Sequence, residues 1–262
     1  MTRTLLLLVV AIWLLPTSGH AQFDEAGIFF GVSHYSGDLT ERMIEPLEFN
    51  HAWGFYVRRK MSDHFDLKVQ FTKGKLTGDD ANSSVESGLW RRNLNFESDI
   101  FELSAVAEYN FVKIEKGSYG VTPYVYGGLA GFHFTPYTDI NGKTYDLHHY
   151  KTEGVEYSLT QFSIPFGAGL KLQINGTGCL GFEAGLRKTF TDYLDDVSGY
   201  YPTDLAGYSD GESMNVRTQL SYRSPEADPT AQDLPKLNSQ RGNPDKNDWY
   251  LFFGVTLGVN LK

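Results

Sequence analysis

The sequence predicts an all-β fold, an eight-stranded antiparallel transmembrane β-barrel of the up-and-down type. Three observations predict it: an N-terminal export signal, eight stretches in which apolar and polar residues alternate, and connections that are alternately long and short. Alternation with a period of two places every second side chain on one face of a strand. In a membrane barrel one face meets lipid and the other faces the lumen.

The first element is a signal peptide at residues 1–21, which leaves residues 22–262 for the barrel. Arg3 supplies a positive charge before the apolar run Leu5–Leu15, which is too short to cross a membrane as a helix. The small residues of Gly19-His20-Ala21 resemble a cleavage site. The mature chain is therefore expected outside the cytoplasm.

The strands follow in order along the mature chain. Residues 65–71 alternate most regularly, with Phe65, Leu67 and Val69 on one face and Asp66 and Lys68 on the other. The full set is about 25–35, 51–60, 65–71, 96–111, 123–134, 161–174, 179–189 and 249–261. Aromatic residues near strand ends are expected at the membrane–water interface: Trp53, Tyr109, Tyr124, Tyr126 and Trp249.

The connections between these strands fall into two classes. The first, third, fifth and seventh have about 15, 24, 26 and 60 residues, the last of them being an irregular loop at about 190–248. The second, fourth and sixth are short: Met61–His64, Lys113–Val121 and Asn175–Gly178. Outer-membrane barrels have short periplasmic turns and long outer loops, and an even strand number puts both termini on the periplasmic side.

The polar faces of the strands carry charges of both signs. The charges expected in the lumen are Asp66, Lys68, Glu102, Glu108, Lys171, Glu183 and Arg187. A barrel of eight strands is just wide enough for side chains to fill it, so a packed polar lumen without an open pore is expected. The alternative is a soluble barrel with these charges in solvent.

Composition excludes several classes of protein. Cys179 is the single cysteine, so no intramolecular disulfide can form. The formal net charge of −9 argues against a nucleic-acid binder. No phosphate-binding loop, dinucleotide fingerprint or zinc spacing occurs, and His148-His149 lacks the spacing of a helical metal pair, so neither a cofactor nor a metal is expected.

Enzymatic activity is not expected either. Gly31-Val32-Ser33-His34-Tyr35 begins like a nucleophile elbow but lacks its second glycine. Because barrel acyl hydrolases exist in outer membranes, Ser33 or Ser36 with His34 or His133 is considered as a catalytic pair, but it is not favoured. The carboxylates of Thr191–Asp196 are compatible with a Ca²⁺ ligand set, but the spacing matches no EF-hand, and a solvated acidic loop or a partner contact is favoured.

Several strings resemble one family of small outer-membrane barrels. They are Gly31–Thr40, Arg92–Phe96, Glu108–Phe111, Thr122–Gly128, Ile164–Gly167, Arg241-Gly242, Asn247-Asp248 and, most specifically, Thr189–Ser198. In this order they cover nearly all of the mature chain, which is thereby identified as resembling the DUF6089 family.

The resemblance implies a non-enzymatic role in the cell outer membrane. The family's best-known member belongs to the type IX secretion system and associates with a periplasmic ring of a lipoprotein, PorK, and its partner, PorN. By this resemblance the short turns are the docking surface for a PorK/PorN-like ring, with Asp63, His64, Lys113, Glu115, Lys116 and Asn175 as candidate contacts.

Two further expectations concern the other end of the barrel. Arg92 is expected to pair with Asp192, Asp195 or Asp196 across the barrel mouth. The alternative function is a free-standing surface barrel that binds or adheres through its outer loops, which the long last loop suggests.

Overall fold

The computed structural model describes residues 23–114, 118–174, 177–203, 205, 216–231, 235 and 239–261. The predicted signal peptide at residues 1–21 lies outside them. Within the described chain, eight antiparallel strands close into a barrel. They are β1 (Glu25–Ser36), β2 (Asn50–Lys60), β3 (Phe65–Asp79), β4 (Asn95–Asn110), β5 (Gly120–Ile140), β7 (Thr160–Ile174), β8 (Gly178–Thr189) and β9 (Trp249–Asn260).

Each of these strands pairs with the next, and β9 returns to pair with β1. The closing register runs from Glu25↔Asn260 to Ser36↔Trp249. Closure satisfies the backbone hydrogen bonds of both outermost strands, so the barrel has no open edge. The predicted fold class is confirmed.

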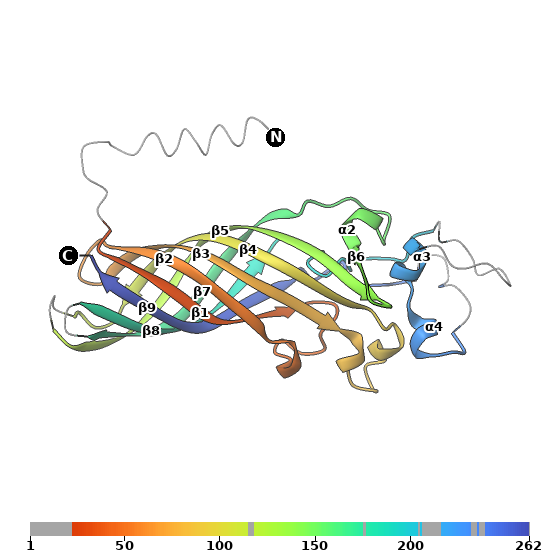
Figure 1. Ribbon diagram of the computed structural model, residues 1–262, viewed down its shortest axis with the longest axis horizontal. Coiled ribbons are helices and arrows are strands. Elements are labelled where there is room, and N and C mark those ends of the chain that lie inside the picture. The colour runs from red at the N-terminus through yellow and green to blue at the C-terminus, as the bar shows by residue number, and fades with distance from the viewer. Residues whose placement is uncertain are drawn as a thin grey trace, which may run out of the picture.

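The two ends of the barrel differ in their connections. The start of β1 and the end of β9 lie together at the left of Figure 1, where the Leu261 amide donates to the Asp24 carbonyl at 2.9 Å. The short connections lie at this end, which we call the turn end. The long connections gather at the opposite end, which we call the loop end (Figure 1).

The outer wall of the barrel is apolar. Large hydrophobic side chains on all eight strands are exposed: Ile28, Phe30, Trp53, Phe55, Phe65, Leu67, Phe101, Leu103, Val121, Val125, Leu129, Phe162, Ile164, Phe166, Leu170, Ile174, Phe182, Phe253, Leu257 and Val259. A continuous apolar surface of this extent is far larger than the patches of soluble proteins. It has the character of the lipid-facing band of a membrane barrel.

The lumen has two different halves. All seven charges predicted for it point inward, and six of them are buried, with Asp66 partly exposed near the turn end. In the loop half the lumen is apolar instead, filled by Phe29, Leu76, Ile100, Phe132, Phe134 and Phe252. The predicted polar filling therefore extends as far as the buried Glu102–Arg187 ion pair, which lies against Tyr250 and Phe252, and apolar side chains fill the lumen beyond it.

The long connections fold into a cap over the loop end. Its elements are η2 (Asp80–Asn82), η3 (Leu89–Arg91), the short strand β6 (Lys143–Asp146), α2 (Leu147–Tyr150), α3 (Val216–Ser221) and α4 (Ser224–Ala227). β6 continues from β5 through Asn141 and Gly142, whose φ values of 55° and 77° suit a tight hairpin turn. Among the described residues, no helix has both the length and the apolarity needed to cross a membrane.

The cap and the loop half of the lumen share one hydrophobic core. Leu39, Leu94, Leu147, Leu194, Val197 and Leu220 from the cap join the lumenal phenylalanines in a single buried cluster. The loop end is thus closed by packed side chains.

Two sequence-based details are wrong. β3 and β5 extend beyond the predicted ranges, to Asp79 and Ile140. Tyr124 and Tyr126 are not interfacial: they point into the lumen, where they are only 1% and 7% exposed. The polar lumen of the turn half accepts their hydroxyl groups, as Tyr124 donates to Glu183 at 3.0 Å.

Candidate functional site

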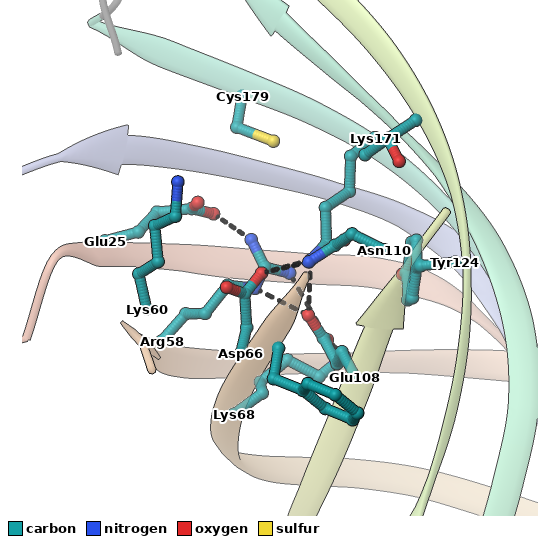
Figure 2. Close-up of polar contacts among 12 residues, drawn as sticks. Glu25, Arg58, Lys60, Asp66, Lys68, Glu108, Asn110, Tyr124, Lys171 and Cys179 are labelled. Atoms are coloured by element: carbon teal, nitrogen blue, oxygen red, sulfur yellow. Dashed lines mark hydrogen bonds and ion pairs between the residues drawn. The ribbon is translucent and has the colours of Figure 1, made fainter. Parts of the chain in front are cut away.

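A buried carboxylate organises the turn half of the lumen. Glu108 lies on β4, is fully buried, and meets three cations from three other strands. Its oxygens lie 2.9 Å from Arg58 Nε, 3.4 Å from Lys68 Nζ and 2.6 Å from Lys171 Nζ. Figure 2 shows Arg58 and Lys171 converging on this carboxylate from different sides. A charge buried in this way is stable only because it is paired.

Other carboxylates complete the network around Glu108. Glu25 accepts from Arg58 at 2.5 Å, and Asp66 accepts from Lys171 at 2.7 Å. Glu183 accepts from Lys68 at 2.6 Å. Each cation therefore bridges two carboxylates, which ties six strands together across the lumen.

An open pocket of about 250 Å³ lies between this network and the turn end. Its walls are Glu25, Arg58, Asp66, Asn110, Thr122, Lys171, Gln173 and Cys179, and its rim is Asp24, Lys60, Asp63, Val112, Ile114 and Asn260. Figure 2 shows Lys171 directed at Asp66, Asn110 and Glu108, with Cys179 on the far side of Glu25 and Arg58. The lining carries four carboxylates and three cations, so the pocket is polar and nearly charge-balanced.

The turn residues singled out by sequence lie beside this pocket. Asp63 forms part of the rim and pairs with Lys113 at 2.7 Å, both side chains being about half exposed. His64 is held by the Asn110 carbonyl, 2.8 Å from its Nδ1. Glu115, Lys116 and Asn175 lie outside the described residues. Of the three described turn candidates, Asp63 lines the pocket, Lys113 is joined to it by the ion pair, and His64 contacts Asn110 and the Tyr109 ring instead.

The pocket also contains residues that the sequence did not single out as a site. Glu25, Arg58 and Cys179 line it, although only the alternation of their strands was noted. Arg58 lies on the same face of β2 as Gly54 and Tyr56, opposite the apolar residues. This alternation was sufficient to place Arg58 in the lumen. Nothing local in the sequence marks Glu25 as its partner.

A second buried network lies in the cap. Arg92 makes a bidentate ion pair with Asp80, both contacts being 2.7 Å, and donates to the Asp38 carbonyl at 2.8 Å. The expected pairing of Arg92 with Asp192, Asp195 or Asp196 is replaced by this contact. Asp80 is closer because η2 follows β3 directly and turns its carboxylate toward the β3–β4 loop.

Arg241 is another buried cation of the cap. Its Nη1 lies 3.0 Å from Glu153 and 2.6 Å from the Asp196 carbonyl, and its Nε donates to the Ser221 carbonyl at 3.3 Å. Glu153 in turn accepts from the backbone amides of Ser198 and Gly199, each at 3.0 Å. Arg241 therefore joins three segments of the cap.

The predicted mouth aspartates are buried, and two of them, Asp195 and Asp196, accept side-chain hydrogen bonds. Asp195 accepts from the Tyr35 hydroxyl, and Asp196 accepts from Thr152 and from Tyr157, the latter at 2.7 Å. Asp192 is 7% exposed. No group of three or more His, Cys, Asp or Glu side chains in the described part of the chain is arranged to hold a metal ion.

Burial makes the mouth aspartates weaker acids than exposed aspartates. Loss of hydration raises the pKa of Asp192 to about 7, and the negative charges of Asp38 and Glu153 add to the effect. Burial also raises the pKa of Asp196 to about 6 and raises the pKa values of Asp195 and Asp248. A carboxyl whose folded pKa is raised stabilises the folded state most below its unfolded pKa, and this contribution is lost as the pH rises through the folded pKa.

We therefore expect the cap to become less stable between about pH 4 and pH 7. Asp192→Asn should reduce this dependence, because an amide does not ionise in that range. The measurement is hydrogen exchange of the cap amides at several pH values, corrected for intrinsic exchange rates. Asp245→Asn, at an exposed position in the same loop, is the control and should leave the profile unchanged. Identical profiles for wild type and Asp192→Asn would contradict this assignment.

The residues considered for hydrolysis occupy structural positions. Ser33 Oγ donates to the Lys75 carbonyl at 2.6 Å, inside the barrel. His34 contacts the backbone of Glu45 and Glu48, and His133 lies on the outer wall, 3.0 Å from Thr160 Oγ1. These contacts place Ser33 and the two histidines on opposite faces of the wall, so Ser33 forms no nucleophile–base pair with either of them; no contact of Ser36 with a histidine is seen in the described residues.

Comparison with known proteins gives a family and similarities of fold. The family model described as "Domain of unknown function (DUF6089)" matches residues 3–207. No curated protein sequence matches the chain.

Among solved structures, Neisserial surface protein A is 11% identical over 90% of this chain and 96% of its own, with a TM-score of 0.44. The N-terminal barrel domain of OprF from Pseudomonas aeruginosa is 12% identical over 91% and 98%, with a TM-score of 0.39. The attachment invasion locus protein Ail of Yersinia pestis, bound to the heparin analogue sucrose octasulfate, is 10% identical over 91% and 99%, with a TM-score of 0.40.

Proposed function

The chain belongs to the DUF6089 family, and from its architecture we propose a non-enzymatic barrel of the bacterial outer membrane that anchors periplasmic protein machinery through its turn end. The best-known member of the family is PorG of the type IX secretion system. By resemblance to PorG, the machinery is the periplasmic ring of that system, built from a PorK-like lipoprotein and its PorN-like partner.

The difference between the two ends carries this proposal. The loop end is filled by a hydrophobic core shared with the cap, whereas the turn end opens into a polar pocket of about 250 Å³. Charged groups around such an opening can recognise a protein partner through complementary charge. With the apolar wall in the membrane and the termini on the periplasmic side, this pocket faces the periplasm.

The rim of the pocket suits a protein partner. Asp63 and Lys113 form an ion pair whose side chains are about half exposed, so they remain available for further contacts. Exposed pairs of this kind contribute only about 0–1 kcal/mol to stability, so replacing one partner leaves the barrel folded. A rim charge of this kind can therefore be tested without disrupting the fold.

The test is an affinity pull-down from gently solubilised outer membranes, with mass spectrometry of the captured proteins. We expect the wild-type barrel to retain the ring lipoprotein and its partner, and Asp63→Lys to lose most of them, because it places two cations side by side on the rim. Glu156→Lys is the matched control: Glu156 forms an exposed ion pair with Lys151 at 3.0 Å in the loop after α2.

Each result has a definite meaning. Capture that is lost with Asp63→Lys and kept with Glu156→Lys supports docking at the turn end. The reverse pattern favours the alternative surface barrel, which binds through its outer loops. Type IX cargo that is exported normally after deletion of the gene would refute the secretion role.

A further inference from the structure

The β1–β2 connection lies across the outer wall of the barrel. In β1, Ser33 and Tyr35 face the lumen, so His34 between them faces outward, yet it is fully buried. Residues 43–49, which we call the collar, cover it. The Glu45 amide donates to His34 Nε2 at 3.1 Å, and the Phe49 ring lies 4.9 Å from the His34 ring. The collar therefore packs against the wall and not over the mouth.

The polar groups of the collar point toward the protein. Glu48 is 4% exposed, and its carboxylate accepts from Thr77 Oγ1 at 2.6 Å and from Asn82 Nδ2 at 2.5 Å. Its carbonyl accepts from Asn50 Nδ2 at 3.2 Å and lies 3.4 Å from His34 Nδ1. The collar is thus fixed to β1, β2, β3 and η2 by buried hydrogen bonds.

The apolar side chains of the collar point away from the protein. Met43, Ile44, Leu47 and Phe49 are 53%, 54%, 73% and 39% exposed. A loop in water has the opposite arrangement, with apolar groups buried and polar groups exposed. Segments that lie at a membrane surface present such a cluster of apolar side chains to the lipid.

The level of the collar agrees with a lipid boundary. A strand crosses the hydrocarbon layer in about 9–11 residues. Counted from Glu25 at the turn end of β1, that distance reaches Ser33 to Tyr35, and counted from Lys60 on β2 it reaches Asn50. The collar is attached at these positions, so its apolar side chains continue the apolar wall at the outer edge of the hydrocarbon layer.

We propose that the collar is a lipid-binding surface that inserts Met43, Ile44, Leu47 and Phe49 among the acyl chains of the outer leaflet. This rests on the proposed membrane placement and is independent of the proposed ring partner. Lipid is favoured over a protein occupant because the collar lies against β1 at the outer end of its apolar face, which carries Ile28 and Phe30. His34 and Glu48 hold the segment rigid, so the collar fixes the depth of the barrel in the bilayer.

The test measures contact between the collar and acyl chains. In a Cys179→Ser background, Leu47→Cys is labelled with the fluorophore NBD, and the barrel is reconstituted in phosphatidylcholine vesicles with ordinary or brominated acyl chains. We expect a blue-shifted emission that brominated chains largely quench. Val155→Cys is the control, because Val155 is 46% exposed in the connection after α2, which belongs to the cap.

A label at Leu47 that emits as in water and is not quenched would overturn the proposal. If that label is unquenched while Leu47→Cys in native outer membranes is shielded from a water-soluble maleimide, the collar meets a protein and the lipid proposal is wrong. Phe162→Cys tests the membrane placement separately, because Phe162 is 66% exposed on the apolar outer wall in β7. If the label at position 162 is also unquenched, the membrane placement itself is wrong.

A second variant tests the attachment. His34→Ala removes the buried ring that the collar covers, so quenching at Leu47 should fall while the barrel keeps its heat-modifiable electrophoretic mobility. Unchanged quenching would contradict the role of His34 in holding the collar.

Discussion

Glu108→Gln is expected to destabilise the barrel by about 3–5 kcal/mol, the usual cost of removing one partner of a buried ion pair. The amide leaves Arg58, Lys68 and Lys171 with one carboxylate each and removes the negative charge that all three cations share at the centre of the network. The measurement is urea unfolding of the detergent-solubilised barrel, followed by the heat-modifiable shift in electrophoretic mobility.

The matched control for Glu108 is Glu97→Gln. Glu97 pairs with Lys75 on the same β3–β4 ladder, but both side chains are roughly two-fifths exposed, so the loss should stay below about 1 kcal/mol. Equal losses for the two variants would show that the three-cation cluster contributes no more than a surface pair.

Arg241→Met is expected to open the cap while the barrel stays folded. Methionine keeps much of the apolar volume but leaves the Glu153 side chain, only 3% exposed, without its cation. Leaving a buried carboxylate unpaired costs about 3–5 kcal/mol, which the cap alone must bear. Limited proteolysis should then cleave the loop of residues 190–248 many times faster.

Arg91→Met provides the comparison for Arg241, because Arg91 is an exposed arginine at the end of η3. Its proteolysis rate should match that of the wild type. Accelerated cleavage accompanied by loss of heat-modifiable mobility would mean that the cap and the barrel unfold together, which contradicts the expectation of a separate cap.

The strands could be predicted because lipid imposes one rule on the whole outer wall. Within the hydrocarbon layer, outward residues are apolar and inward residues polar, as in Phe65–Phe71. At the outer edge of that layer the pattern reverses. In β3, Lys73 and Lys75 point outward while Leu76 is buried, so a search for apolar outward residues stops too early. The same reversal hides the final residues of β5.

The sites were less predictable because they depend on contacts distant in sequence. The polar phase of β2 and β4 places Arg58 and Glu108 in the lumen, but the register that makes them partners is set by pairing across β3. The partner of Arg92 depends on the turn that η2 makes after β3, which propensity does not determine. His34 faces outward and is covered by the collar, and the alternation of apolar and polar residues in β1 does not indicate this.

The composition of the cap has a consequence for biogenesis. Tyr35 and Asp248 are in contact across 213 positions, and the Asn243 amide reaches Asp38 across 205. Such contacts form late, since the intervening chain must first be brought together. With the proposed outer-membrane placement, we therefore expect the cap core to assemble only after β9 has joined β1, once the long connections have crossed the bilayer. The folded cap then opposes withdrawal of the barrel from the membrane, because withdrawal would require unfolding a hydrophobic core on the outer side.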